Sequence, residues 1–239
     1  MRAAGPRLSA WPGLVLAGLL LTTAPAAYAA QTAAERAFQL RCENSIGSTV
    51  AVVDAQDNGW SLDNTRTFRT LTAMKGQGGG YVLGLTRAES RIAIGSEGKL
   101  LQLVGSSYEC IAPKVIVKLS YVPIIIYIGS EFAPGTCAYE EILAHEMRHL
   151  KAYLNHLPKV EEAVRAALDK RFVAKPLYAA GGQARALLDQ ELERRWIPFA
   201  RAEMAKVEAQ QAAIDAPQEY ARLSKVCKGE VQSLLSRRR

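Results

Sequence analysis

Residues 143–157 read LAHEMRHLKAYLNHL, and most expectations for this chain follow from that segment. Hydrophobic residues recur in it every three or four positions, as on one face of an α-helix; they are Leu143, Met147, Leu150, Leu154 and Leu157. His145 and His149 fall on a neighbouring face, one helical turn apart. The segment therefore predicts an amphipathic helix that presents two imidazoles side by side.

These histidines and the glutamate between them are suited to a metal site. Two imidazoles one turn apart can bind a single Zn²⁺ at about 2.0–2.1 Å each. Glu146 is rotated about 100° from His145 around the helix, so its carboxylate is a poor ligand but can reach a water on the metal. We therefore predict His145 and His149 as metal ligands and Glu146 as the general base. The alternative is a pair of structural histidines on a partly buried helix.

A family resemblance points to the same chemistry. The pentapeptide HEMRH at residues 145–149 resembles the signature of the zincin metallopeptidases. The resemblance covers this helix and the strand expected before it, not the whole chain. It implies Zn²⁺ as cofactor, a peptide or protein as substrate, His145 and His149 as zinc ligands and Glu146 as base. Zincins also present an edge strand on which substrate adds as a further strand, and the resemblance implies this role for residues 124–128.

A catalytic zinc usually has three protein ligands, and Glu191 is the predicted third. It falls on the apolar face of a helix expected to begin near residue 183, a face that also carries Ala184, Leu187, Leu188, Leu192, Trp196 and Phe199. A carboxylate on a buried face needs a partner, and zinc would be one. The arrangement resembles the gluzincins, zincins whose third ligand is a Glu on a later helix. An ion pair from Glu191 to Arg194 or Arg195 is the alternative, and Glu161 and Glu162 are further ligand candidates.

The third histidine of residues 143–157 fits a ligand role poorly. His156 shares a helix face with His149 but lies seven residues further on, about 10.5 Å along a continuous helix. Metzincins bring in a third histidine through a glycine turn, whereas residues 150–155 contain no glycine. His156, Tyr153 and Tyr178 remain candidate hydrogen-bond donors to the transition state, with plain packing or surface roles as the alternative.

The rest of the chain predicts an α+β fold. Before residue 135 the pattern indicates strands, at residues 49–53, 91–95, 115–121 and 124–128. Pro123 cannot donate a ladder hydrogen bond, so the last of these is expected to be an edge strand or to bend there. After residue 135 the pattern is helical, with helices at 136–157, 160–172, from 183 onward and beyond Pro217. We therefore expect a β-rich N-terminal half with an edge strand, packed by a helical C-terminal half that carries the zinc helix.

The N-terminus indicates export. Residues 1–29 combine a basic start, an apolar run and the small-x-small triplet Ala27-Tyr28-Ala29, as in a secretory signal peptide. An uncleaved anchor is the alternative. Residues 30–239 are then one zincin-like metallopeptidase domain, secreted or periplasmic.

The cysteines agree with an oxidising compartment. The four, Cys42, Cys110, Cys137 and Cys227, form no C-x-x-C pair, which argues against a thiolate zinc site. An even number in an exported chain suggests two disulfides, with three possible pairings. A bridge between Cys137 and Cys227 would tie the last helix to the zinc helix.

The formal net charge of +7 falls to +5 once the two arginines of the leader are removed, and it is explained by solubility. No basic patch is interleaved with aromatic residues, so nucleic-acid binding is not expected, and no later segment predicts a stable membrane span. The predicted function is an exported zinc-dependent peptidase. A non-catalytic envelope protein with a structural zinc site and an amidase of cell-wall peptides are the alternatives.

Overall fold

The computed structural model describes residues 32–45, 51–76, 80–105, 108–173 and 175–236. Residues 1–29, the predicted signal peptide, lie outside the described residues. From Ala33 onward the chain forms one compact unit. Within the described residues, no helix combines the length and the apolar character that a membrane crossing requires.

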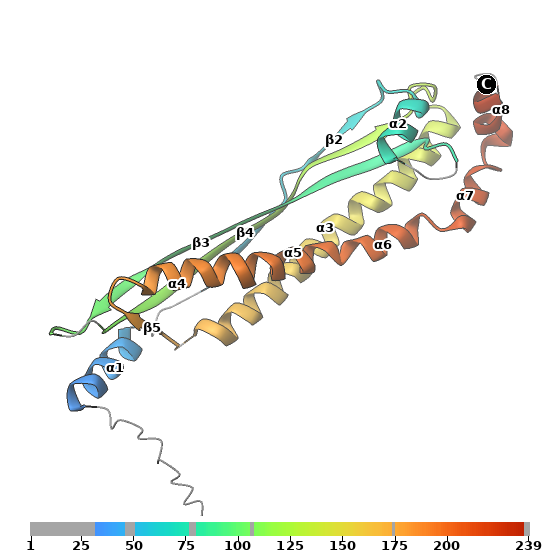
Figure 1. The fold of residues 1–239 in the computed structure, drawn as a ribbon. Helices are drawn as coiled ribbons and strands as arrows, with labels where there is room; N and C mark the ends of the chain where they lie inside the picture. The colour runs from blue at the N-terminus through green and yellow to red at the C-terminus, as the bar shows by residue number, and fades with distance from the viewer. Residues whose placement is uncertain (1–31, 46–50, 77–79, 106–107, 174, 237–239) are drawn as a thin grey trace, which may run out of the picture. The chain divides into compact units, whose positions relative to one another are not determined.

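The sheet is built around a long antiparallel hairpin of β3 (Gly84–Gln102) and β4 (Tyr108–Ile128), seen in Figure 1. The opposite side of β4 pairs successively with β5 (Leu177–Ala180), β1 (Val52–Gln56) and β2 (Trp60–Asp63). The first of these is antiparallel to β4 and the other two are parallel to it. β4 is therefore the central strand, and its side chains make up much of the core.

Residues 124–128 do not form the predicted edge strand. They are the end of β4 and pair with β2 on one side and β3 on the other. Pro123 is tolerated because the ladders are interrupted beside it: pairing with β1 ends at Ser120, and pairing with β2 begins at Ile124. The register with β3 also shifts here. β3 is an outer strand that among the described strands pairs only with β4, and it is the strand whose Thr86 contacts Glu146 on the histidine helix.

The histidine helix, α3 (Cys137–Phe172), follows the N-cap residue Thr136, whose hydroxyl accepts a 3.3 Å hydrogen bond from the Tyr139 amide. It does not end before Pro158 as predicted, but continues through this exposed residue. Proline removes one helical hydrogen bond. Burial of the following apolar residues Val160, Val164 and Leu168 against the core maintains the helix beyond it.

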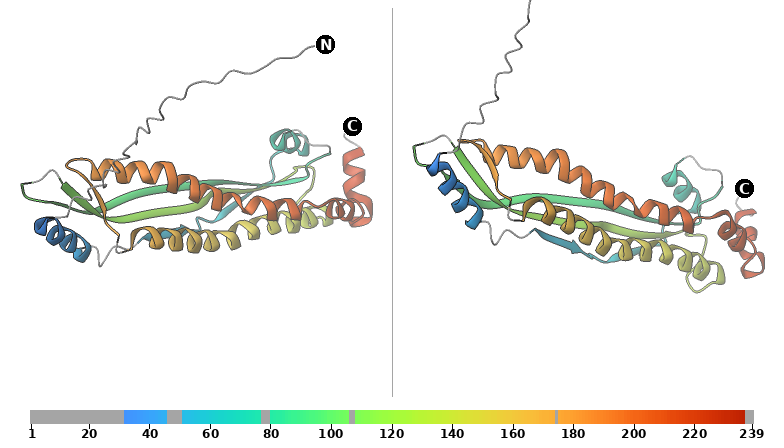
Figure 2. Two further views of the ribbon diagram at one scale, coloured as in Figure 1. Left: turned by 60° about the horizontal axis from the view of Figure 1, so that its bottom comes forward. Right: turned by 90° about the horizontal axis from the view of Figure 1, so that it is seen from below.

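The remaining helices return along α3. They are α4 (Ala184–Glu191), the π-helical turn η1 (Leu192–Trp196), α5 (Ile197–Ala205) and α6 (Val207–Ile214). α5 packs on β3 and α3, and α6 packs on α3, as the views in Figure 2 show.

The described chain continues after α6 with α7 (Pro217–Leu223), the 3₁₀ turn η2 (Cys227–Gly229) and α8 (Glu230–Ser236). In the described part of the chain before the hairpin, the helices are α1 (Ala33–Ser45) and α2 (Phe68–Lys75). The predicted α+β class is confirmed.

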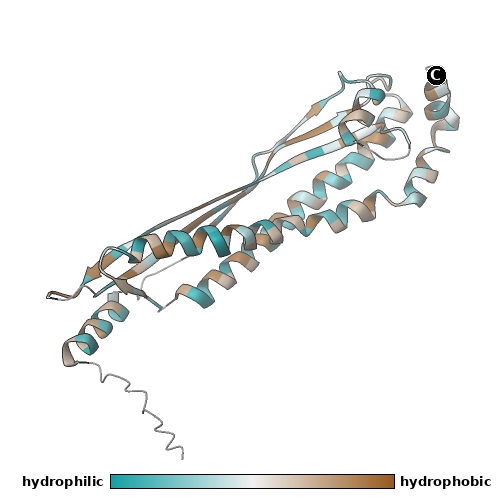
Figure 3. Ribbon diagram, viewed as in Figure 1, coloured by the Kyte–Doolittle hydropathy of each residue, from teal (hydrophilic) through white to brown (hydrophobic). Residues whose placement is uncertain are grey.

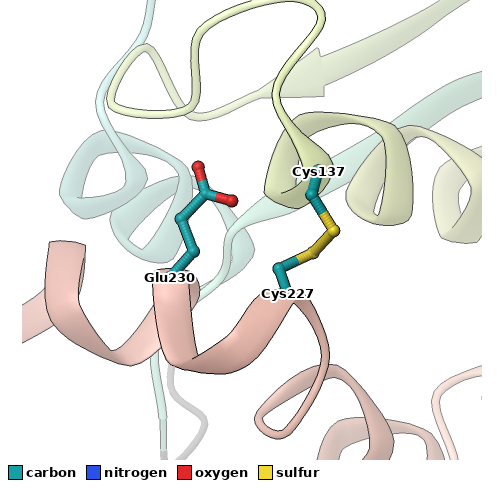
Figure 4. A group of neighbouring side chains, drawn as sticks. All are labelled: Cys137, Cys227 and Glu230. Carbon is teal, nitrogen blue, oxygen red and sulfur yellow. A yellow bond between two sulfur atoms is a disulfide. The ribbon is translucent and has the colours of Figure 1, made fainter.

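Two disulfides connect distant parts of the chain. Cys42–Cys110 joins α1 to β4, and Cys137–Cys227 joins the first turn of α3 to the segment after α7, as drawn in Figure 4. Their Cα–Cα distances of 6.6 and 5.6 Å suit such bonds. The prediction of two bridges is confirmed, and Cys137 pairs with Cys227 among the three possibilities.

The core lies between the sheet and the helices, and Figure 3 shows hydrophobic residues recurring along both hairpin strands and α3. Leu119 on β4 is 0% exposed there, whereas Leu100 on β3 is 49% exposed. We expect Leu119→Ala to lower the free energy of unfolding by about 2–5 kcal/mol, because it leaves a cavity in a packed layer. Leu100→Ala is the matched control, with an expected loss below about 1 kcal/mol. Equal losses in urea denaturation would contradict this placement of the core.

Candidate metal centre

His145 and His149 face the same space, as their helical spacing predicts. Both are buried, and their Nε2 atoms lie 3.2 Å apart. Asp215, the residue that ends α6, supplies a third donor atom from the returning chain. Its Oδ1 lies 3.3 Å from Nε2 of His145 and 3.2 Å from Nε2 of His149. Three ligand-type atoms therefore converge on one point.

The spacing of these three atoms fits a metal ion. Tetrahedral ligands with bonds of about 2.0–2.1 Å lie about 3.3–3.4 Å from one another, close to the observed 3.2–3.3 Å. His145, His149 and Asp215 can thus hold a metal ion without rearrangement of the backbone. The arrangement defines a three-donor site and leaves the identity of the metal open.

Gln211 on α6 sets the proton position of His149. Its Nε2 donates a 3.2 Å hydrogen bond to the His149 backbone carbonyl, which can only accept, so the amide orientation is determined. Its Oε1 then lies 2.5 Å from Nδ1 of His149 and must accept from it. A neutral ring with its proton on Nδ1 has a lone pair on Nε2, pointing at Asp215 and His145. This is the tautomer that a metal requires.

His145 lies beside a network of charged groups. Its Nδ1 is 2.8 Å from Nη2 of Arg148 and 3.4 Å from Oε1 of Glu219 on α7. A guanidinium only donates, so the Arg148 contact fits an Nδ1 without a proton. A carboxylate only accepts, so the Glu219 contact fits the other tautomer, which has its proton on Nδ1 and frees Nε2. Hydrogen bonds from Arg222, and less strongly from Arg148, lower the pKa of Glu219 to about 2. Glu219 therefore stays ionised next to His145.

Asp215 is held as an anion by its neighbours. Its other oxygen, Oδ2, accepts a 2.9 Å hydrogen bond from Nζ of Lys75, the last residue of α2. Hydrogen bonds with His145 and His149, together with the Lys75 bond, hold the pKa of Asp215 far below its usual range despite partial burial. α2 thus supports a carboxylate that the end of α6 presents to the histidines.

Glu146 points to β3 rather than to the returning helices. The Thr86 hydroxyl lies 2.9 Å from its Oε2 and 3.1 Å from its backbone carbonyl oxygen. Burial raises the pKa of Glu146, although the charges of His149 and His145 and the Thr86 hydrogen bond act in the opposite direction. The result is a buried carboxylate near the histidines, held by a hydroxyl from the outer strand.

Glu191 lies elsewhere, and the carboxylate that the structure places beside the two histidines is that of Asp215. The Glu191 carboxylate accepts two hydrogen bonds from Arg171, at 2.8 and 2.7 Å, and one of 3.3 Å from the Trp196 indole. Arg171 follows His149 on α3 by about 33 Å of helical rise, too far for a shared ion. The apolar surroundings of Glu191 were recognised in the sequence, but its main partner is this arginine, with Arg195 at 3.9 Å.

The predicted transition-state donors are core residues. The Tyr121 hydroxyl donates a 2.8 Å hydrogen bond to the Met204 carbonyl, so it accepts from Nδ1 of His156 at 2.9 Å. Tyr153 packs on Tyr121 with ring centroids 4.9 Å apart, and burial raises its pKa to about 12. The Tyr178 hydroxyl is buried on β5 and finds no partner in the described part of the chain. None of the three is among the contacts of the metal centre.

A second cluster of ligand-type residues is structural. Figure 4 shows Cys137 and Cys227 joined by their disulfide, with Glu230 beside them. Oε2 of Glu230 accepts a 3.2 Å hydrogen bond from the Ala138 amide in the first turn of α3. With both sulfurs in a covalent bond, no thiolate remains to bind a metal, and Glu230 caps a helix.

No protein-family model matches the chain, and comparisons with curated proteins and with solved structures find no match. Functional inference therefore depends on the contacts described above.

The Gln211 contact with His149 predicts a change in metal affinity. Gln211→Ala removes the acceptor that orients the imidazole, and we expect the affinity of the site for a divalent metal ion to fall about 10–100-fold. Gln210, its exposed neighbour on α6, provides the matched control, because Gln210→Ala should leave affinity unchanged. Competition titration with a chromogenic chelator measures both. Equal affinities for the two variants would show that Gln211 does not act on the site.

Gly84 on β3 allows the close approach of α3. A Cβ at this position would lie 2.6 Å from Oε1 of Glu146 and 2.7 Å from Cγ2 of Ile142. We expect Gly84→Ala to displace this carboxylate and to cost about 1–3 kcal/mol of stability. Gly95→Ala, on the same strand with nothing within 4 Å of the added atom, is the control and should be tolerated. Thermal unfolding of both variants tests this, and a fully stable Gly84→Ala protein would refute the contact.

Proposed function

We propose that this chain is an exported zinc-dependent peptidase that hydrolyses peptide bonds with Glu146 as general base. The observation that carries the proposal is a three-donor metal site one residue away from a buried carboxylate on the same helix. The resemblance of residues 145–149 to the zincin signature supports it. The expected gluzincin variant is replaced by one whose third ligand is an aspartate.

The donor set favours zinc. Two imidazole nitrogens and one carboxylate oxygen are the ligand types of catalytic zinc sites, which keep one position open. Structural zinc sites usually take four protein ligands, whereas the group found in the described residues has three, His145, His149 and Asp215. This favours catalysis over a structural role. Zinc bound here would act as a Lewis acid and lower the pKa of a water towards 7.

The residues of the chain account for the proton transfers. Glu146 lies in a buried position where a raised pKa makes its carboxylate a stronger base than one in water. It takes the proton from the attacking water and passes it to the leaving amine. Thr86 holds Oε2 of Glu146 from β3, which keeps the carboxylate oriented throughout. Gln211 and Glu219 orient the two histidine rings.

Tyr220 replaces the predicted donors as the candidate for stabilising the transition state. Its ring centroid lies 6.5 Å from that of His145, and the residue is 45% exposed, so it can meet a substrate. Its hydroxyl is 3.4 Å from Nζ of Lys75. Burial and the charge of Asp215 raise the pKa of Tyr220, so the phenol keeps its proton and can donate it in a hydrogen bond.

The two disulfides support an oxidising compartment. Such bonds form and persist in secreted and periplasmic proteins and are rare in the cytosol. They agree with the signal peptide proposed for residues 1–29, which would direct the chain across the membrane.

Replacement of Glu146 separates catalysis from metal binding. We expect Glu146→Gln to bind zinc as the parent does, because the three ligands remain, and to lose about 10²–10⁴-fold in hydrolysis, because the amide cannot accept the proton. Zinc content by elemental analysis and cleavage of a fluorogenic peptide library are the two measurements. Glu140→Gln, an exposed change on the same helix, is the control.

The outcomes distinguish the rival functions. Bound zinc with equal hydrolysis by the parent and Glu146→Gln would favour a structural site in a non-catalytic envelope protein. Cleavage of cell-wall peptides but not of the library would identify the amidase. Asp215→Asn should lose zinc while Glu191→Gln keeps it, and the reverse result would overturn the ligand assignment.

A further inference from the structure

A cavity of about 570 Å³ lies beside α5, away from the metal centre, and its polar lining comes from four elements. Its charged side chains are Arg91 on β3, Lys118 on β4 and Arg201 on α5. Its neutral polar side chains are Gln56, Ser90 and Ser120. The other three lining residues are apolar, so no carboxylate faces the cavity.

The positive charge of this cavity is poorly compensated. Arg91 lies 3.5 Å from Glu89, but both side chains are more than half exposed, so solvent screens the pair. Lys118 and Arg201 form no ion pair with any residue that the structure describes. Asp54 pairs with Lys118 across the strands and offsets part of its charge, but its Oδ2 accepts a 2.9 Å hydrogen bond from the Gln56 amide and forms no ion pair with Lys118. Three cations thus share one hollow.

Strand register explains why these cations are close together. Arg91 pairs with Ser120 across the hairpin, and Lys118 precedes Ser120 by two residues, on the same face of the sheet. Such diagonal neighbours lie about 7–8 Å apart. Gln56 pairs with Ser120 from the other side, and Arg201 joins from α5. The backbone therefore keeps these exposed cations near one another, where one anion can contact more than one of them.

We propose that this cavity binds a small ligand with two or more phosphate or carboxylate groups. Guanidinium groups form paired hydrogen bonds to such anions, the ammonium adds a point charge, and serine hydroxyls can donate to remaining oxygens. The site is distinct from the metal centre, because Arg91 follows Thr86 by about 17 Å along β3. It adds a binding function that does not depend on the proposed hydrolysis.

Isothermal titration of the folded protein with tripolyphosphate and with citrate tests this site. We expect saturable binding of one equivalent. The triple variant Arg91→Gln, Lys118→Gln, Arg201→Gln should bind at least about tenfold more weakly. The control Lys99→Gln, Lys151→Gln, Arg194→Gln removes the same charge from exposed positions outside the cavity, and its affinity should stay within about twofold.

Because both probes also chelate metals, the titration is repeated with the metal-free protein and with Asp215→Asn, where binding should persist. Loss of binding in Asp215→Asn would place the probes at the metal centre and overturn the proposal. If both triple variants bound the probes equally weakly, binding would be explained by diffuse electrostatic attraction, and the proposal would be refuted. Absence of saturable binding to the parent protein would refute it as well. Displacement of tripolyphosphate by vesicles of cardiolipin, whose headgroup carries two phosphates, would identify a lipid headgroup as the ligand. Failure of the vesicles to displace it would identify a soluble anion.

Discussion

The packing of α3 on the central strand β4 is the constraint on which the rest of the structure depends. The apolar side chains of both elements form one continuous core, which sets the rotation of the helix about its axis. Successive residues of an α-helix are rotated by about 100° around its axis. Once the orientation of the helix is set, this rotation decides which way each polar side chain points. His145 and His149 are directed at α6 and α7, and Glu146 at β3. The different directions of the histidines and of Glu146 at the candidate metal centre are thus a consequence of core packing.

The centre is assembled from segments that are distant in sequence, and each contributes a different property. α3 provides the two imidazoles, β3 holds the Glu146 carboxylate, and the end of α6 provides Asp215. α2 contributes Lys75, whose hydrogen bond adds to those of His145 and His149 in lowering the pKa of Asp215. Burial raises the pKa of both carboxylates, but the two end with opposite shifts. Burial outweighs the other interactions at Glu146, whose pKa is raised, whereas hydrogen bonds with His145, His149 and Lys75 outweigh it at Asp215, whose pKa is lowered.

The chain between α6 and α8 is held against α3 by more than one kind of interaction. Gln211 bonds to His149 from α6, Glu219 bonds to Arg148 from α7, and the Cys137–Cys227 disulfide closes the segment covalently. Asp215 lies between these attachments, in a short break between two helices. A ligand placed on such a break needs support on both sides to stay within bonding distance of the histidines.

The sequence by itself determined the helix that carries His145, Glu146 and His149, the α+β class and the presence of two disulfides, because these follow from local spacing, period and residue counts. The tertiary structure decided which acid lies beside the histidines. Glu191 ends α4 and Asp215 follows α6, and only the path of the chain places one beside Arg171 and the other beside the imidazoles. The tertiary structure likewise decided that residues 124–128 belong to the central strand of the sheet and that helix α3 continues beyond Pro158. In each case long-range packing outweighed a local rule, since burial against distant residues is not encoded in the neighbouring sequence.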